Sequence, residues 1–108
     1  MHAQGRLQLI LRELREEMQA LYGDRLVRLL VYGSHARGDA EQGSDIDVLI
    51  TLQGAVDPGE EIARASGLLA SLSLKHGEVL SCVFVSEERF RNEQSPLLLN
   101  VRKEGVAV

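Results

Sequence analysis

Several residue types are scarce in this sequence: it has no tryptophan, one cysteine, two prolines and only four tyrosine and phenylalanine residues in 108 positions. The lone Cys82 cannot form a disulfide within the chain, and it stands in an apolar run where a thiol acts as a small hydrophobic side chain. One cysteine and three scattered histidines also lack the paired spacing of a zinc site. No apolar stretch approaches the ~20 residues that a membrane span requires.

Basic residues are outnumbered, with 12 Lys and Arg against 16 Asp and Glu and a net charge of −4. A protein that follows a long nucleic-acid backbone needs a basic stripe, so we expect no long nucleic acid as a partner. The first residues show no basic stretch followed by an apolar run, which is the pattern of a secretory signal. We therefore expect a cytoplasmic protein without a membrane anchor.

What the sequence does contain is typical of one globular domain spanning residues 1–108, with 44% hydrophobic and 26% charged residues. A chain of this length buries only about two-thirds of the surface that its unfolded form exposes. A core this small cannot supply both walls of a substrate cleft, so we expect a second subunit or a partner protein to complete it.

The apolar pattern predicts the elements in turn. Apolar residues recur at helical spacing over residues 4–21, and residues 26–32 form a short branched run that predicts a buried strand ending at Gly33. A polar segment over 34–44 predicts one helical turn followed by a loop. Residues 45–52 read as a second strand, whose polar start opens onto a site.

The second half predicts a helix, a strand and a helix. Asp57-Pro58 supplies a helix cap followed by proline, and helical spacing continues to Gly77. Residues 78–85 predict a third strand, and Ser95-Pro96 begins a last helix ending near Gly105. This order predicts an α/β (α+β) fold, a small mixed sheet with helices mainly on one face and the other face open.

The segment from Gly33 to Val48 carries the chemistry. Gly33 at a strand end allows close approach of a bulky anion, and Ser34 can cap the helical turn, whose free amides would face a phosphate. The segment has neither the lysine of a Walker loop nor the glycine spacing of a dinucleotide fingerprint. We predict that Gly33 and Ser34 bind phosphate, together with the forked donors of Arg37.

Asp45 and Asp47 stand two apart on the second predicted strand, so their side chains leave the same face about 6–7 Å apart. Two close carboxylates repel each other, and a hard divalent cation between them and substrate phosphates makes the pair favourable. We predict that they bind Mg²⁺, or Mn²⁺ in its place, and that Ile46 and Val48 face the core.

The pattern of Gly33-Ser34, ten residues, then Asp45-Ile46-Asp47-Val48 resembles the signature of polymerase-β-type nucleotidyltransferases. In particular, Gly33 to Gly38 with Ser44 to Ile50 resembles the stand-alone minimal nucleotidyltransferases (MNT) of bacteria and archaea. The resemblance implies the nucleotidyltransferase fold and a magnesium-dependent transfer of a nucleoside monophosphate, AMP from ATP in first place, with release of pyrophosphate. It implies Asp45 and Asp47 as catalytic metal ligands and Gly33, Ser34, Arg37 and Ser44 as nucleotide-binding residues.

The resemblance further implies a helical HEPN-type partner protein, because members of this family commonly form toxin–antitoxin pairs with such partners, in which an MntA-like subunit is the antitoxin. A hydroxyl of that partner, or of a small molecule, is then the acceptor. The other possibility is a non-catalytic nucleotide-binding antitoxin that masks its partner. Transfer to an antibiotic is disfavoured because no acceptor-binding domain follows the third strand.

A complete site of this superfamily takes a third carboxylate from a neighbouring strand, where it binds metal or accepts a proton. The candidate is Glu78, at the start of the third predicted strand, whereas Ser81 or Cys82 occupies the position if Glu78 is out of reach. Each of these residues also has a purely structural interpretation. The acids Asp45, Asp47 and Glu78 stand at strand entrances, where acids are often solvated, and Arg37 can pair with Asp39 or Glu41. A lone loop histidine such as His35 is most often merely exposed. His35 is therefore left out of the predicted catalytic set.

Overall fold

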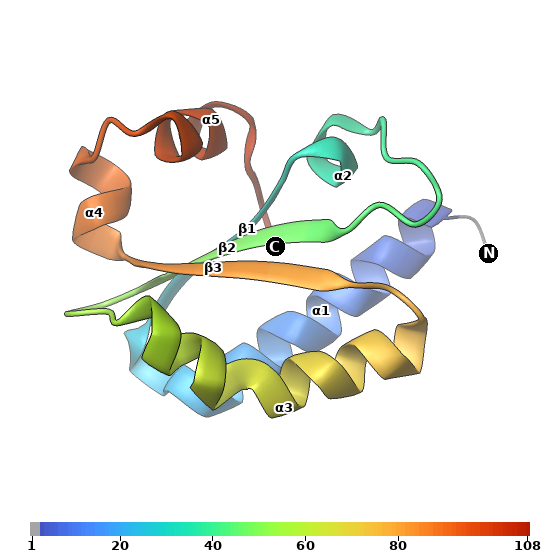
Figure 1. Cartoon of the computed structure of the whole chain (residues 1–108), viewed down its shortest axis with the longest axis horizontal. Helices are drawn as coiled ribbons and strands as arrows, with labels where there is room; N and C mark the ends of the chain where they lie inside the picture. Colours follow the sequence, from blue (N-terminus) through green and yellow to red (C-terminus); the bar gives the residue numbers. More distant parts are fainter. Residues whose placement is uncertain (1–2) are drawn as a thin grey trace.

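The computed structural model describes residues 3–108 as a four-stranded mixed sheet with helices on both faces (Figure 1). The elements, in chain order, are α1 (Ala3–Tyr22), the 3-10 turn η1 (Gly23–Arg25), β1 (Leu26–Tyr32), α2 (Ser34–Arg37), β2 (Ile46–Leu52), α3 (Pro58–His76), β3 (Leu80–Ser86), α4 (Glu87–Asn92), α5 (Pro96–Glu104) and β4 (Val106–Ala107). None of the helices among these residues is long and apolar enough to cross a membrane.

The strands lie in the order β3-β2-β1-β4, so β1 and β2 form the centre of the sheet. β1 runs antiparallel to β2 and to β4, whereas β2 and β3 are parallel and are joined by the crossover helix α3. The register pairs Tyr32 with Asp47 across β1 and β2, and Asp47 with Ser81 across β2 and β3. These three residues therefore form one row across the sheet.

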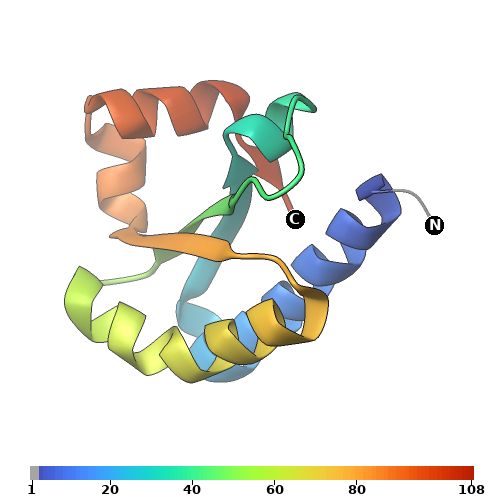
Figure 2. The same cartoon turned by 45° about the vertical axis from the view of Figure 1, so that its right-hand side comes forward.

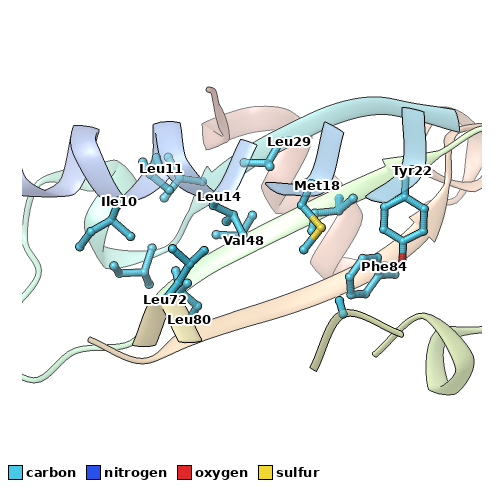
Figure 3. Packing of buried hydrophobic residues seen from close by; sticks show 14 of the residues in the cluster. Ile10, Leu11, Leu14, Met18, Tyr22, Leu29, Val48, Leu72, Leu80 and Phe84 are labelled. Carbon is cyan, nitrogen blue, oxygen red and sulfur yellow. The ribbon is translucent and has the colours of Figure 1, made fainter. Parts of the chain in front are cut away.

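The two long helices, α1 and α3, share one face of the sheet, as the sequence predicts. Alternate residues of β2 point toward them, and α1 inserts a stripe spaced by three and four residues, which is the periodicity of a helix with one buried face (Figure 3). The buried side chains of this larger cluster include Ile10, Leu11, Leu14, Met18, Tyr22, Leu29, Val48, Leu72, Leu80 and Phe84.

The second face is not left open, and here the prediction needs correction. α4 and α5 pack on it and bury a smaller cluster made of Leu30, Leu49, Val85, Phe90, Leu98 and Val101. Figure 2 shows α5 and α2 on this side of the sheet, with α1 and α3 on the other. At the end of this face where β1 finishes and β2 begins, Tyr32, Asp47 and Ser81 remain partly exposed.

A buried ionic contact joins α4 to the sheet. Glu87, the first residue of α4, is only 6% exposed and accepts hydrogen bonds from the guanidinium of Arg28 at 3.0 Å and the hydroxyl of Thr51 at 2.9 Å. The Arg28 guanidinium also lies over the ring of Phe90. Since a buried carboxylate needs such partners, this contact fixes where α4 sits.

Helix boundaries follow the predicted caps. The side chain of Asp57 accepts a hydrogen bond from the Glu60 amide at the start of α3, and Gly77 ends that helix at a φ of 68°. Ser95 caps α5 in the same way. The predicted fold class is therefore confirmed, and the elements that the sequence did not predict are η1, α4 and β4.

Candidate functional site

The site begins at Gly33, where the chain turns out of β1 and into α2. Its φ of 75° and ψ of −150° lie in a region open essentially to glycine alone. The Gly33 carbonyl accepts hydrogen bonds from the amides of Ala36 and Arg37, both at 3.1 Å. The amides of Ser34 and His35, at the start of the turn, have no acceptor within so short a helix. They are the backbone donors that the sequence assigns to phosphate.

Gly33 also touches the carboxylate of Asp47. A Cβ placed on Gly33 would lie 2.7 Å from Oδ2 of Asp47, closer than such atoms approach one another. The contact follows from the sheet register, which places Tyr32 opposite Asp47. The glycine turn and the carboxylate therefore belong to one site, although residues 34–46 separate Gly33 from Asp47 in the sequence.

The two aspartates lie at the entrance of β2. Asp45 is exposed and precedes the first strand residue, and Asp47 is partly buried within the strand. Ile46 and Val48 are buried in the larger cluster, so Asp47 points to the opposite face. Burial raises the pKa of Asp47, the neighbouring charge of Asp45 raises it further, and His35 opposes the shift. The ionised form of Asp47 is therefore less favourable than that of a free carboxylate, and a bound cation would compensate this cost.

Neither Asp45 nor Asp47 forms an ion pair with a basic side chain of residues 3–108. Carboxylate oxygens are the donors that Mg²⁺ prefers, and this ion usually takes one or two of them and completes its shell with water and substrate phosphates. The two aspartates fit that donor set. Within the same residues, no group of three or more His, Cys, Asp or Glu side chains is spaced to hold a metal.

The position beside Asp47 on β3 belongs to Ser81. Partners in a parallel pair point to the same face, so Ser81 shares the face of Asp47. Cys82 pairs with Val48 and packs against the larger cluster, and burial raises its pKa to about 12. Of the two residues that the sequence left open for this position, the structure places Ser81 on the site and Cys82 in the core.

The structure does not bring Glu78 together with the two aspartates. Glu78 lies two residues before β3, where its carboxylate is 3.8 Å from a guanidinium nitrogen of Arg6 on α1. It lines a groove of about 800 Å³ together with residues of α1. The predicted third strand begins two residues later than expected, and this shift leaves Glu78 outside the sheet.

The remaining predicted nucleotide-binding side chains are engaged within the chain. Arg37 pairs with Asp39 and with Glu104 of α5, each at 3.2 Å, and the bond to Asp39 raises the Arg37 pKa. The Ser44 hydroxyl accepts a hydrogen bond from the Glu41 amide and stabilises the loop. These pairs engage Nε and Nη1 of Arg37, so both carboxylates would compete with a phosphate for its forked donors.

Two residues that the sequence did not assign to the site lie beside it. Tyr32 is the register partner of Asp47, and its pKa is raised by burial and by the charge of that carboxylate. His35 places Nε2 at 3.2 Å from the carbonyl oxygen of Ser44. The signal for both was their position next to Gly33 and Ser34, but their contacts depend on the register and on the course of the loop.

Comparison with known proteins adds an independent observation. Residues 11–99 match the family model described as a nucleotidyltransferase domain. A candidate protein adenylyltransferase of Methanocaldococcus jannaschii is 35% identical over 96 residues, which cover 88% of this chain and 90% of that protein. A second candidate protein adenylyltransferase of the same organism is 39% identical over 44 residues, covering 41% of this chain and 44% of that protein.

Solved structures show the same fold. A chain from a toxin–antitoxin crystal structure with AMP-PNP superposes with a TM-score of 0.56 at 18% identity, covering 98% of this chain and 72% of that one. A chain from a variant of the MntA–HpeT toxin–antitoxin complex gives a TM-score of 0.60 at 14% identity, covering 88% and 69%. At these identities the likeness concerns the fold alone.

Proposed function

Because this chain belongs to the nucleotidyltransferase domain family, we propose that it is a magnesium-dependent enzyme that transfers AMP from ATP to a hydroxyl group of a partner protein. The observation that carries the proposal is the contact between Gly33 and the Asp47 carboxylate. It joins a glycine turn suited to phosphate with a carboxylate pair suited to Mg²⁺ at one end of the sheet.

In the proposed reaction, the acceptor oxygen bonds to the α-phosphorus of ATP while the bond from that phosphorus to the bridging oxygen breaks, and pyrophosphate leaves. Asp45 and Asp47 would hold the metal, and the missing side chain of Gly33 leaves room for the Asp47 carboxylate beside the phosphate-binding turn. Bound Mg²⁺ would neutralise charge on the phosphate oxygens. In this proposal the hydroxyl proton passes to solvent, because Ser81, the neighbour of Asp47 on β3, has no carboxylate to accept it.

The proposed acceptor is a helical HEPN-type protein. Two relatives in Methanocaldococcus jannaschii are named as candidate protein adenylyltransferases, and chains of the same fold come from toxin–antitoxin complexes. Asp45 is exposed at the sheet end, so a macromolecular acceptor can reach the carboxylate pair. The partner would then complete the substrate cleft and form a hetero-oligomer with this chain.

Isothermal titration of ATP into the purified chain, with Mg²⁺ or with EDTA, tests the site. We expect binding that requires Mg²⁺ and that the Asp45→Asn/Asp47→Asn double variant loses. Asp24→Asn is the control, because Asp24 is an exposed aspartate of η1, which lies at the opposite end of β1 from Gly33. Binding that is equal in the double variant would refute the site.

Transfer is tested separately by incubating the chain with ATP labelled on its α-phosphate and a purified HEPN-type protein. Label on that protein supports the proposed acceptor. Label found only on small molecules would support the proposed transfer activity and would refute the proposal that the acceptor is a protein.

A further inference from the structure

The start of the loop that leads to Asp45 is joined to the phosphate-binding turn through Asp39, whose amide donates to the Ser34 carbonyl, and the end of the loop is joined to it by the imidazole of His35. We propose that His35 is a positioning residue, which fixes Asp45 relative to Gly33 and Asp47 through a hydrogen bond to the Ser44 carbonyl. The inference rests on the proposed function, because it concerns the same metal site, and it assigns a role to a residue that the sequence left as an exposed loop histidine.

The geometry determines the direction of the hydrogen bond. Nε2 of His35 lies 3.2 Å from the Ser44 carbonyl oxygen, and the contact is partly buried. A carbonyl oxygen only accepts hydrogen bonds, so Nε2 must carry the hydrogen. In the neutral ring this leaves Nδ1 without one. The interaction therefore selects one of the two tautomers of His35.

The bond acts on the residue next to Asp45. On the far side of Asp45, the Ile46 amide donates to the Val79 carbonyl at 2.8 Å and fixes the start of β2. On the near side, the hydrogen bonds between Glu41 and Ser44 close a turn within the loop but do not join it to α2. The His35 ring supplies that connection, so the Asp45 backbone is held from both directions.

The His35 ring also connects the Asp45 loop to Gly33 and Asp47. His35 follows Ser34 directly and lies in α2, whose first turn is tied to the Gly33 carbonyl. Gly33 in turn contacts Asp47. One short path therefore connects both carboxylates to the turn. A group that orients metal ligands from the outer shell typically changes metal affinity by about 10–100-fold when it is lost.

The test measures Mn²⁺ binding to the full chain by electron paramagnetic resonance of the free ion, with no turnover required. We expect His35→Ala to raise the dissociation constant by about tenfold, the low end for an outer-shell loss. His35→Gln retains an amide donor near the position of Nε2 and should restore most of the affinity. His76→Ala is the control, because His76 contacts Glu13 on the face of α1 and α3 and should leave Mn²⁺ affinity unchanged.

Unchanged affinity in His35→Ala would overturn the inference, and so would equal losses in the alanine and glutamine variants, since the ring and not the hydrogen bond would then matter. Long-range ¹H–¹⁵N correlation spectra of the wild type provide a test that does not depend on folding of a variant. They should show hydrogen on Nε2 and none on Nδ1 at pH 8, and the opposite tautomer would also refute the inference.

Failure of the proposed function has a different signature. If the wild type binds no Mn²⁺ and no ATP, the metal site itself is absent. If the wild type binds both and the double aspartate variant binds neither, the metal site is supported. The His35 variants then test only the positioning role of His35.

Discussion

Gly33 and Asp47 leave no room for another carbon between them. Alanine at position 33 would place its Cβ 2.7 Å from Oδ2 of Asp47 and would also occupy a backbone region costing about 1–3 kcal/mol. We expect Gly33→Ala to lower the free energy of unfolding by that amount and to weaken magnesium-dependent ATP binding by about tenfold or more. Chemical denaturation and titration calorimetry measure the two effects.

Gly54→Ala is the matched control for this substitution. Gly54 has a φ of 87°, but a Cβ there would meet nothing within 4 Å. It should lose stability by about 1 kcal/mol and retain ATP binding. Equal loss of binding in both variants would show that backbone strain, and not the contact with Asp47, controls the site.

Asp47 is a residue whose ionisation opposes folding. Its pKa is raised in the folded chain, so its favourable contribution is complete below the unfolded pKa and is lost as the pH rises through the folded pKa. At pH 7 without metal, we therefore expect Asp47→Asn to raise Tm by about 2–4 °C, equivalent to about 0.5 kcal/mol in a domain of this size. Differential scanning calorimetry with EDTA measures it, and a lower Tm would contradict the argument.

Ser81 offers a gain of function. A carboxylate at this position would share the face of Asp47 and add a third oxygen donor to the site. We expect Ser81→Asp to lower the Mn²⁺ dissociation constant by about tenfold, a gain of about 1.4 kcal/mol. Ser81→Asn, which has nearly the same shape without the charge, should not. If the two variants bind Mn²⁺ equally, Ser81 does not face the metal site.

At the scale of the elements, the position of α4 depends on Glu87. Burial alone would raise the pKa of Glu87, but hydrogen bonds from Arg28 and Thr51 outweigh it, and the net pKa is lowered. Its stabilising contribution is therefore full above the ordinary glutamate pKa and is lost as the pH falls through the folded value. Solvent screens part of it, because the Arg28 side chain is 44% exposed.

We expect Glu87→Gln to lower the free energy of unfolding by about 1–2 kcal/mol at pH 7, with the difference from the wild type shrinking below about pH 4.5. Urea denaturation at a series of pH values measures this. Glu88→Gln is the control, because Glu88 is exposed on the same helix. A difference that does not depend on pH would mean that the shape of Glu87, and not its charge, fixes α4.

The long elements could be predicted from the sequence because each has a strong local signal. The buried stripe of α1 and the capping residues Asp57 and Ser95 are visible without a structure, and their helices begin and end within a residue or two of expectation. α4 escaped because six residues contain too little periodicity, and β4 because two residues gain their identity only by pairing with β1. Because α4 was not predicted, the covering of the second face by α4 and α5 was not predicted either.

The candidate site was only partly predictable, for a related reason. The motif places Gly33 at the end of one strand and Asp47 near the start of the next, so their approach could be expected once the two strands pair. Whether Glu78, Ser81 or Cys82 stands beside Asp47 depends on the parallel register of β2 and β3, and a shift of one residue reverses the face of every side chain. The nucleotide and metal roles of these residues remain predictions until the titrations are made.

At the scale of the whole molecule, one strand separates two hydrophobic clusters. Val48 and Leu49 are adjacent in β2 and fully buried, yet they belong to opposite clusters. The larger cluster contains Tyr22 and the smaller is contacted by Tyr32, and the chain has no tryptophan. Each tyrosine is therefore a natural reporter of one cluster.

We expect both clusters to unfold in one transition, because they share the same central strands. In Tyr32→Phe the fluorescence of Tyr22 reports the larger cluster, and in Tyr22→Phe that of Tyr32 reports the smaller. Within each variant, the denaturation midpoint by fluorescence should equal the midpoint by circular dichroism. An earlier fluorescence transition in Tyr22→Phe would show that α4 and α5 detach before the rest of the molecule.

The pairing of Tyr32 with Asp47 also bears on how the chain tolerates change in length. Because the register of β1 and β2 sets the distance between Gly33 and Asp47, the number of residues in the intervening loop does not. An insertion between Asp39 and Ala40 would lengthen a surface segment outside the sheet, and doubling a loop costs only about 0.6 kcal/mol in closure entropy. The length of the spacer at this point is thus the most variable part of the signature, and a peptide tag could be carried there close to the site while His35, Arg37 and Ser44 are kept.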